Sequence, residues 1–252
     1  MARCPFARKK KDQAIFCKSP DNPGYGLDSK KQFKFKTNFG TDQNQCLNNK
    51  GRDCLYNFDE NNKRKYGPKA PLFCERIWVN PLDCRQALIS SNLVISGRVI
   101  ENQWPPPKTK QIMSTLELKK VKYCINRWCH NLHWQDTGAY ELLTQAIDRF
   151  GQYDGCLNDH DINDRYNKLD MIFEQVKKDG RLCTRQEIAP ANFREMGGII
   201  VHIGPENELY IGGGGIHRFA MAYLLSLPLI PAQVGYVHND AIPYLDLLRR
   251  PD

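Results

Sequence analysis

Four consecutive glycines at residues 212–215 constrain this 252-residue chain more than any other feature. The apolar run 208–211 before them is typical of a strand, and residues 216–225 after them carry the apolar spacing of a buried helix. A loop without Cβ atoms lets a ligand approach the backbone closely, and the first turn of a helix directs unpaired N–H groups toward it. The pattern therefore predicts an anion-binding loop. Its structural alternative is a tight turn that binds nothing.

His217 and Arg218 begin that helix. A guanidinium group can hold phosphate oxygens in two places, and an imidazole can donate a proton or a hydrogen bond. We therefore expect nucleotide phosphate at this loop, with His217 as a catalytic candidate. The alternative is that both are solvated residues of a first helical turn. The expected nucleotide-binding residues here are Gly213, Gly214, Gly215, His217 and Arg218.

The segments around the loop extend this pattern. Residues 199–204 predict a strand, residues 208–211 predict its antiparallel partner, and residues 227–238 predict a turn and a further strand. This order of hairpin, glycine loop, helix and strand resembles the ParB/sulfiredoxin-like superfamily. The residues that carry the resemblance are Gly214, Gly215, His217, Arg218, the run 225–227, Ile230, Pro231 and Val234.

The resemblance covers residues 72–242 and implies an α+β fold in which helices flank a mixed sheet. Its first strand is expected at residues 76–83. An insertion at residues 94–160 separates the two ends of the domain, and residues 134–137 within it resemble a signature of long bacterial ParB-like proteins. The other expected elements are a strand at 94–100 and helices at 116–125, 140–150 and 159–180.

Three further site residues follow from the resemblance. It implies that Arg185 and Gln186, which come after the helix 159–180, approach the bound ligand. It also implies that Asp83, at the end of the first strand, is a catalytic carboxylate. The structural alternative for Asp83 is to cap a short helix over residues 84–90.

The members of the superfamily differ in their chemistry. Sulfiredoxins carry a nucleophilic cysteine where this chain has Ile216, and chromosome-partition proteins continue into a DNA-reading domain for which few residues remain. Free-serine kinases move a nucleotide phosphate to a small hydroxyl acceptor, which requires phosphate clamps, usually Mg²⁺, and a carboxylate base. We therefore expect a phosphotransferase or phosphohydrolase that uses ATP, ADP or CTP. Many members have Asp where this chain has Gly214, so a metal ligand would have to come from elsewhere.

The positive charge of the chain lies in its first 70 residues, which hold 16 Lys and Arg against 7 Asp and Glu; residues 71–252 hold 20 against 21. This basic segment is poor in aliphatic residues, so it would need a bound metal or disulfide bonds to fold alone. Zn²⁺ or iron–sulfur ligation, disulfide bonds and unlinked thiols all remain open for its cysteines. We expect a module at 1–70, joined by a linker at 66–71 to a domain at 71–252. The four candidate metal ligands are Cys4, Cys17, Cys46 and Cys54.

Lysines alternate with aromatic residues at 30–36 in this module, and further basic runs lie at 8–11 and 63–65. Such a surface can stack on bases and neutralise phosphates, so the module is expected to contact nucleic acid or an acidic partner. The alternative is a solubilising face. This feature supports a second class of function, a nucleic-acid-binding protein or ParB-like nuclease.

Two more expectations concern cysteines and compartment. Cys124, Cys129, His130 and His133 lie close enough in sequence for a second metal site, and the alternative is that these cysteines pack as small apolar groups. No apolar run reaches the length of a membrane span, so we expect a cytoplasmic protein without one. The ten cysteines are many for a reducing compartment unless some bind metal, which leaves export open.

Metal analysis combined with thiol titration tests the N-terminal cysteines. If Zn²⁺ or iron is bound, we expect stoichiometric metal in the purified protein and its release, with loss of structure, on chelation. Protein that carries neither metal nor reactive thiols at Cys4, Cys17, Cys46 and Cys54 would show disulfide bonds and contradict ligation.

Overall fold

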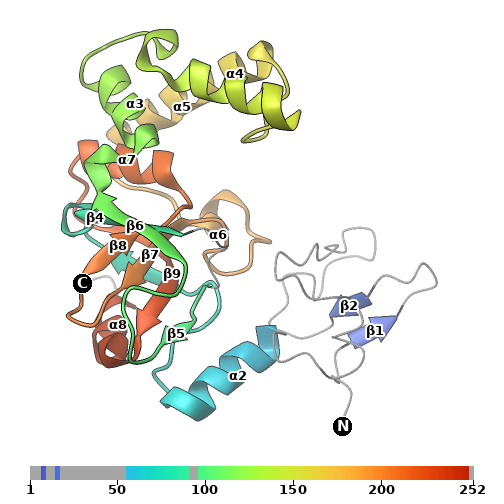
Figure 1. Ribbon diagram of the computed structural model, residues 1–252, viewed down its shortest axis with the longest axis vertical. Helices are drawn as coiled ribbons and strands as arrows, with labels where there is room; N and C mark the ends of the chain where they lie inside the picture. The colour runs from blue at the N-terminus through green and yellow to red at the C-terminus, as the bar shows by residue number, and fades with distance from the viewer. Residues whose placement is uncertain (1–6, 10–14, 18–54, 91–95, 250–252) are drawn as a thin grey trace.

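The computed structural model describes residues 7–9, 15–17, 55–90 and 96–249. Within these residues the protein is α+β, with a seven-stranded mixed sheet, β3 to β9, and seven α-helices, α2 to α8 (Figure 1). A separate antiparallel pair is formed by β1 (Ala7–Lys9) and β2 (Ile15–Cys17). The α+β class expected from the sequence is confirmed.

The longest strand of the sheet is β9 (Ile230–His238), which pairs with three other strands and all of whose residues are buried. Its mostly apolar sequence, interrupted by Gln233 and His238, is typical of a strand covered on both faces. On one edge it pairs in parallel with β7 (Ile199–Ile203), and on the other it pairs antiparallel with β3 (Arg76–Val79). The short strand β5 (Val99–Ile100) pairs in parallel near the end of β9.

The other half of the sheet begins with the predicted hairpin, in which β8 (Leu209–Ile211) runs antiparallel to β7. β4 (Gln86–Ser90) lies parallel to β8, and β6 (Thr109–Ser114) lies antiparallel to β4 at the edge. The strand order is β3-β9-β7-β8-β4-β6. Parallel and antiparallel neighbours are therefore mixed, as expected.

Three helices form a layer beyond the sheet, and α7 (Ile216–Leu224) lies between this layer and the strands (Figure 1). Aromatic rings hold the layer together; those of Trp128 and Phe173, for example, stack with centroids 4.3 Å apart. Every helix in the described part of the chain is too short or too polar to traverse a lipid bilayer. The helices of the layer are α3 (Lys119–Trp128), α4 (Ala139–Phe150) and α5 (Asp159–Asp179), and α8 (Ile242–Leu248) packs against β3.

Some predicted elements differ from the structure. The helix predicted at residues 84–90 is wrong, because Gln86–Ser90 form β4, where Ala87 and Leu88 are buried between β8 and β6. The sequence analysis missed β6 altogether. The helix predicted from residue 116 begins at Lys119, after a 3₁₀ turn. Of the strand predicted at 94–100, the structure shows Val99–Ile100, and residues 91–95 lie outside the described ranges.

Helix α2 (Leu55–Tyr66) packs against the main domain, although the sequence analysis assigns it to the N-terminal module. Asp59 accepts a hydrogen bond from the N–H of Phe73 at 2.8 Å and forms an ion pair with Arg194 at 2.8 Å. The buried Asn62 donates from Nδ2 to the carbonyls of Pro71 at 2.7 Å and Gly97 at 2.8 Å. The predicted boundary at residue 70 therefore does not coincide with a break in packing.

The other predictions for residues 1–70 lie largely outside the described residues. This holds for Cys4, Cys46 and Cys54 and for the lysines of 30–36. For Cys17 the structure describes the backbone in β2 and not the side chain. The metal, disulfide and nucleic-acid hypotheses for this module remain predictions.

Asn62 tests how α2 is held. Asn62→Ala leaves the buried carbonyls of Pro71 and Gly97 without this donor, which costs roughly 2 kcal/mol. We expect the free energy of unfolding, measured in urea, to fall by about that amount. The control Asn61→Ala, at a half-buried position of the same helix, should stay within about 0.5 kcal/mol of wild type. Equal stability of the two variants would contradict this role for Asn62.

Candidate functional site

The glycine loop continues the pairing of β8 with β7 and then begins α7. The N–H of Gly212 donates to the carbonyl of Ile200 at 2.8 Å, and the carbonyl of Gly214 accepts from the N–H of Ile200 at 3.3 Å. These two bonds hold the loop along the edge of β7. As a result, α7 starts directly beside the sheet.

Close packing against β7 accounts for three of the four glycines. A Cβ atom on Gly212 or Gly214 would lie 2.7 or 2.8 Å from side-chain carbons of Ile200, and one on Gly215 would lie 2.6 Å from the Cα of Ile199. Gly215 also has a φ of +70°, which side-chain-bearing residues rarely adopt. Gly213 differs, because it is exposed and a Cβ there would meet nothing within 4 Å. The tight-turn alternative thus explains residues 212, 214 and 215, while Gly213 forms an open tip.

The backbone N–H groups of residues 213–218 have no acceptor in the described part of the chain. Helix α7 lacks a side-chain N-cap, and its first bonded amide is that of Phe219, which donates to the carbonyl of Gly215 at 2.9 Å. Consecutive unpaired donors at the positive end of a helix dipole favour a bound anion. Anion binding at this loop stays a prediction.

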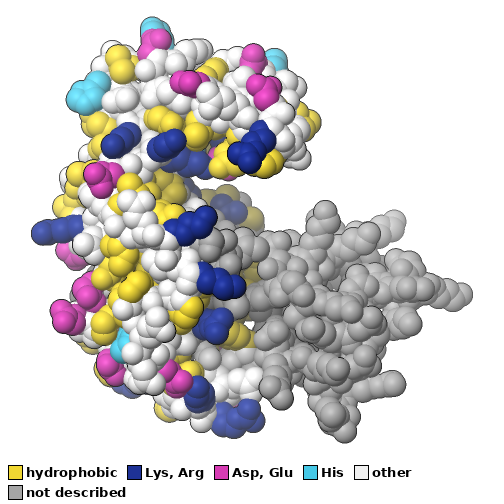
Figure 2. All heavy atoms as spheres, in the orientation of Figure 1, with side chains coloured by type: hydrophobic (Ala, Val, Ile, Leu, Met, Phe, Trp, Pro, Cys, Tyr) yellow, Lys and Arg dark blue, Asp and Glu magenta, His cyan; other side chains and the backbone are white. Residues whose placement is uncertain are grey.

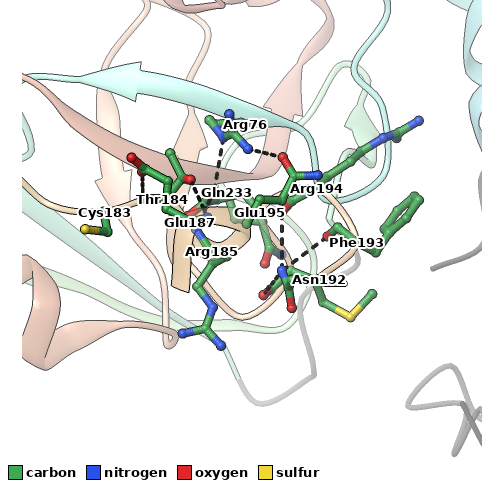
Figure 3. Close-up of polar contacts among 12 residues, drawn as sticks. Arg76, Cys183, Thr184, Arg185, Glu187, Asn192, Phe193, Arg194, Glu195 and Gln233 are labelled. Carbon is green, nitrogen blue, oxygen red and sulfur yellow. Dashed lines mark hydrogen bonds and ion pairs between the residues drawn. The ribbon is translucent and has the colours of Figure 1, made fainter. Parts of the chain in front are cut away.

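Beside the loop, Glu195 contacts Arg76 and the main chain of Arg185 (Figure 3), and it lies close to Arg218. Its side chain is fully buried. Its carboxylate accepts from Arg76 Nε at 3.1 Å and from the main-chain N–H of Arg185 at 3.1 Å, and lies 3.9 Å from Arg218 Nη1. Such partners offset the cost of burying a carboxylate, so Glu195 fixes the positions of the basic groups around it.

Arg218 points toward the segment that carries Glu195. Its Nη2 donates to the carbonyl of Cys183, and its Nη1 is buried with no hydrogen-bond partner. Burial lowers the pKa of Arg218 below its ordinary value; Glu195 opposes this shift and Arg185 adds to it. The residue predicted as a phosphate clamp therefore also holds the chain at Cys183.

Arg185 has a guanidinium that no described residue engages. It is the first residue of the short helix α6 (Arg185–Ile188). The N-terminus of this helix is capped by Thr184 and Glu187, which form a capping box. In Figure 3 its side chain extends away from Glu195, and its Nε is buried without a partner. Gln186, in contrast, accepts a hydrogen bond from Arg76. The hydrogen bond from Arg218 to Cys183 places this segment next to α7, and the expectation that Arg185 and Gln186 approach a bound ligand stays a prediction.

His217 faces the helical layer on another side of α7. Its ring meets that of Tyr166 edge to face at 6.4 Å. Nearby, the carboxylate of Asp154 pairs with Lys120 and with Arg165 Nη2 at 3.4 Å. Burial, together with Lys120 and Arg165, lowers the pKa of His217 to about 4, while Asp154 acts in the opposite direction. His217 is thus neutral near pH 7, where it is a poor proton donor but can form hydrogen bonds.

A second histidine, His202, lies under the start of the loop and is completely buried. Its Nδ1 accepts from the N–H of Tyr236 at 2.8 Å, so the proton of the neutral ring is on Nε2. That Nε2 has no partner, and it lies 2.7 Å from the position a Cβ would take on Gly212. Burial lowers the pKa of His202 to about 3. The sequence analysis gave this residue no role beyond its strand.

Buried polar atoms without a partner concentrate around the loop. Eight such side-chain atoms occur in the described residues, and five of them belong to residues of this region. Each buried polar group costs about 1–3 kcal/mol if neither water nor a ligand pairs it. The five residues are Arg165, Arg185, His202, His217 and Arg218.

The structure does not bring Asp83 to this cluster. Asp83 ends a 3₁₀ helix (Pro81–Asp83) whose N-cap is Asn80, and its side chain is exposed. The groups on which its charge acts are Cys84 and Tyr244. The capping role for Asp83 is wrong because the expected helix is β4, and a role as base stays an untested prediction.

The predicted second metal set is also dispersed. Cys124 is fully buried in α3, whereas Cys129, His130 and His133 are exposed. No group of three His, Cys, Asp or Glu residues suited to a metal ion occurs within the described ranges. Burial raises the pKa of the Cys124 thiol, as expected for a cysteine packed as an apolar group.

The sequence analysis missed Arg76, Lys120, Asp154 and Glu195 as neighbours of the loop. Arg76 and Glu195 are 119 positions apart in the chain, and Lys120 and Asp154 are 34 apart. The available signal was a charge within an otherwise apolar context, such as Arg76 at the start of β3.

Comparisons of the chain with protein-family models, with curated proteins and with solved structures found no match.

The low pKa values of His202 and His217 make stability depend on pH. An unfolded histidine binds its proton near pH 6.5 and the folded His217 only near pH 4, so stability is present above pH 6.5 and is lost as the pH falls toward 4. Between about pH 6.5 and 5, His217 should account for a loss of about 2 kcal/mol.

Urea unfolding at several pH values tests this dependence. His217→Gln should reduce the fall in stability by about that amount, because glutamine does not titrate. The control His160→Gln replaces an exposed histidine on α5 and should keep the wild-type slope. An unchanged slope in His217→Gln would contradict a buried neutral His217.

Proposed function

We propose that residues 213–218 bind the phosphate groups of a nucleotide. The observation that carries the proposal is the run of unpaired main-chain amides, from the exposed Gly213 through the first turn of α7. Amides in this geometry suit phosphate oxygens, which accept several hydrogen bonds at once. The buried His217 and His202 each add an unpartnered ring nitrogen next to the loop.

The positive charge around the loop supports the binding of an anion that carries more than one negative charge. One basic group comprises Arg76, Arg185 and Arg218 around Glu195. The second comprises Lys120 and Arg165, which share Asp154. These two groups together hold five cationic side chains and two carboxylates, a surplus of positive charge that a nucleotide di- or triphosphate would balance. Figure 2 shows a hollow between the helical layer and the sheet-bearing body, with Lys and Arg side chains on both walls.

The resemblance to the ParB/sulfiredoxin-like superfamily supports the same ligand, with ATP, ADP or CTP as candidates. It also favours a phosphotransferase or phosphohydrolase as the activity. In such a reaction His217 would act as a neutral hydrogen-bonding group, because its pKa of about 4 leaves little protonated form near pH 7. The nucleic-acid and nuclease alternative rests on residues 1–70, whose side chains mostly lie outside the described ranges.

Mg²⁺ is the cofactor such chemistry usually requires, but the described residues do not form a ligand set for it. The carboxylates nearest the loop, Glu195 and Asp154, are engaged by arginine and lysine. We therefore assign no step to a metal. Any magnesium would have to be held mainly by the nucleotide itself.

Arg185→Gln is the sharpest test of nucleotide binding, because the Arg185 side chain contacts no described partner and its loss should leave the fold intact. We expect affinity for ATP, ADP or CTP, measured by isothermal titration calorimetry with and without Mg²⁺, to fall at least about tenfold, since a charge-assisted hydrogen bond contributes roughly 1.5–3 kcal/mol. Arg218→Ala should abolish binding but also lower stability, because it removes the bond to Cys183.

The matched control is Arg181→Gln, which removes an exposed arginine of the same segment that pairs with Glu187. It should bind nucleotide like wild type. A bound nucleotide must also raise the melting temperature of the wild-type protein. A screen in which none of the three nucleotides does so, with or without Mg²⁺, would overturn the proposal.

A further inference from the structure

A second hollow, of about 440 Å³, lies beside the last turn of α7, away from the glycine loop. Its volume falls within the range of about 300–1,000 Å³ that is typical of small-molecule sites. It shares no residue with the loop site. The lining residues are Leu82, Arg85, Ser114, Thr115, Leu116 and Tyr223.

One part of the lining is apolar. Leu82 and Leu116 are 39% and 40% exposed, and both face this hollow. A single exposed leucine needs no explanation, but two on opposite segments of one concave surface offer a place for a hydrocarbon chain. The half-buried ring of Tyr223 extends this surface from α7.

The other part carries hydrogen-bond donors and a positive charge. The guanidinium of Arg85 makes no hydrogen bond or ion pair with any described residue, and no carboxylate lines the hollow. The backbone beneath it is fixed, because the carbonyl of Arg85 accepts from the N–H of Thr115 at 3.0 Å and from its hydroxyl at 3.1 Å. Ser114 Oγ accepts from the N–H of Leu116 at 3.3 Å, which leaves its own proton to donate.

We propose that this hollow binds an aliphatic carboxylic acid of medium chain length. The carboxylate pairs with the Arg85 guanidinium, whose planar fork matches its two oxygens, and accepts hydrogen bonds from Ser114 and Tyr223. The chain lies along Leu82 and Leu116. A phosphate or a dicarboxylate fits less well because it would leave the two leucines facing water.

Octanoate titrated into the full-length protein by isothermal titration calorimetry tests the site. We expect saturable binding at one site in the wild type and affinity at least tenfold weaker in Arg85→Gln, which removes the charge but keeps a polar side chain. The matched control Arg98→Gln removes another exposed arginine, outside the hollow, and should bind octanoate like wild type. Octylamine, with the same chain and the opposite charge, should not bind.

Three outcomes would overturn the proposal: no saturable octanoate binding to the wild type, equal affinity in Arg85→Gln, or octylamine binding as tightly as octanoate. Since the Arg85 side chain has no partner in the described structure, Arg85→Gln is expected to melt at the wild-type temperature. This variant should also keep its nucleotide affinity. The two sites are thereby tested independently.

Discussion

The contact on which the rest of the structure depends is the approach of the glycine loop to β7. A Cβ atom at Gly215 would lie within 3 Å of main-chain atoms of Ile199, and main chain in a central strand cannot move aside as a flexible side chain can. Only glycine therefore lets α7 begin this close to the sheet and bury Phe219, Ala220, Met221 and Ala222. The same geometry leaves the first amides of α7 unpaired. The close packing of the loop and the unpaired amides of α7 therefore have a common cause.

The start of α7 also places its side chains between two charged groups. Successive residues of a helix are rotated by about 100°, so His217 and Arg218 diverge. His217 turns to Lys120 and Arg165 in the helical layer, and Arg218 turns to Cys183 and Glu195. Both are largely buried and neither is fully hydrogen-bonded, which lowers the stability of the free protein. A large core offsets such a cost, and a bound anion would remove part of it.

The sequence predicted best those elements whose pattern is local and long. Helix α5 carries a regular apolar stripe and ends at Gly180, and the β7–β8 hairpin has apolar runs on both sides of a turn. The run that became β4 is short and apolar, and such a run fits a helix and a buried strand equally well. The edge strand β6 is mostly exposed and polar, so it lacked any apolar pattern.

The residues of the candidate site also divide into those that the sequence could predict and those that it could not. The loop and its His217–Arg218 pair lie in one stretch and could be predicted as a candidate site from the sequence, and Arg185 was predicted from the resemblance; their binding role stays a prediction. The partners of Glu195 could not be found, because they meet only after strands distant in the chain pair through β9. The burial of His217 and His202 could not be predicted from the sequence either. It turns His217 from an expected proton donor into a neutral group and His202 from a strand residue into an unpaired donor.

A motif names residues by position, whereas binding depends on the donors that remain unpaired after folding. Arg218 donates to the carbonyl of Cys183, and two positions later the N–H of Arg185 donates to Glu195, which Arg76 also holds. These bonds fix the main chain on both sides of Thr184 and direct the Arg185 guanidinium away from the carboxylate (Figure 3). Arg218, the arginine of the motif, thus supports the main chain at Cys183, whereas the Nε of Arg185 keeps no partner among the described residues.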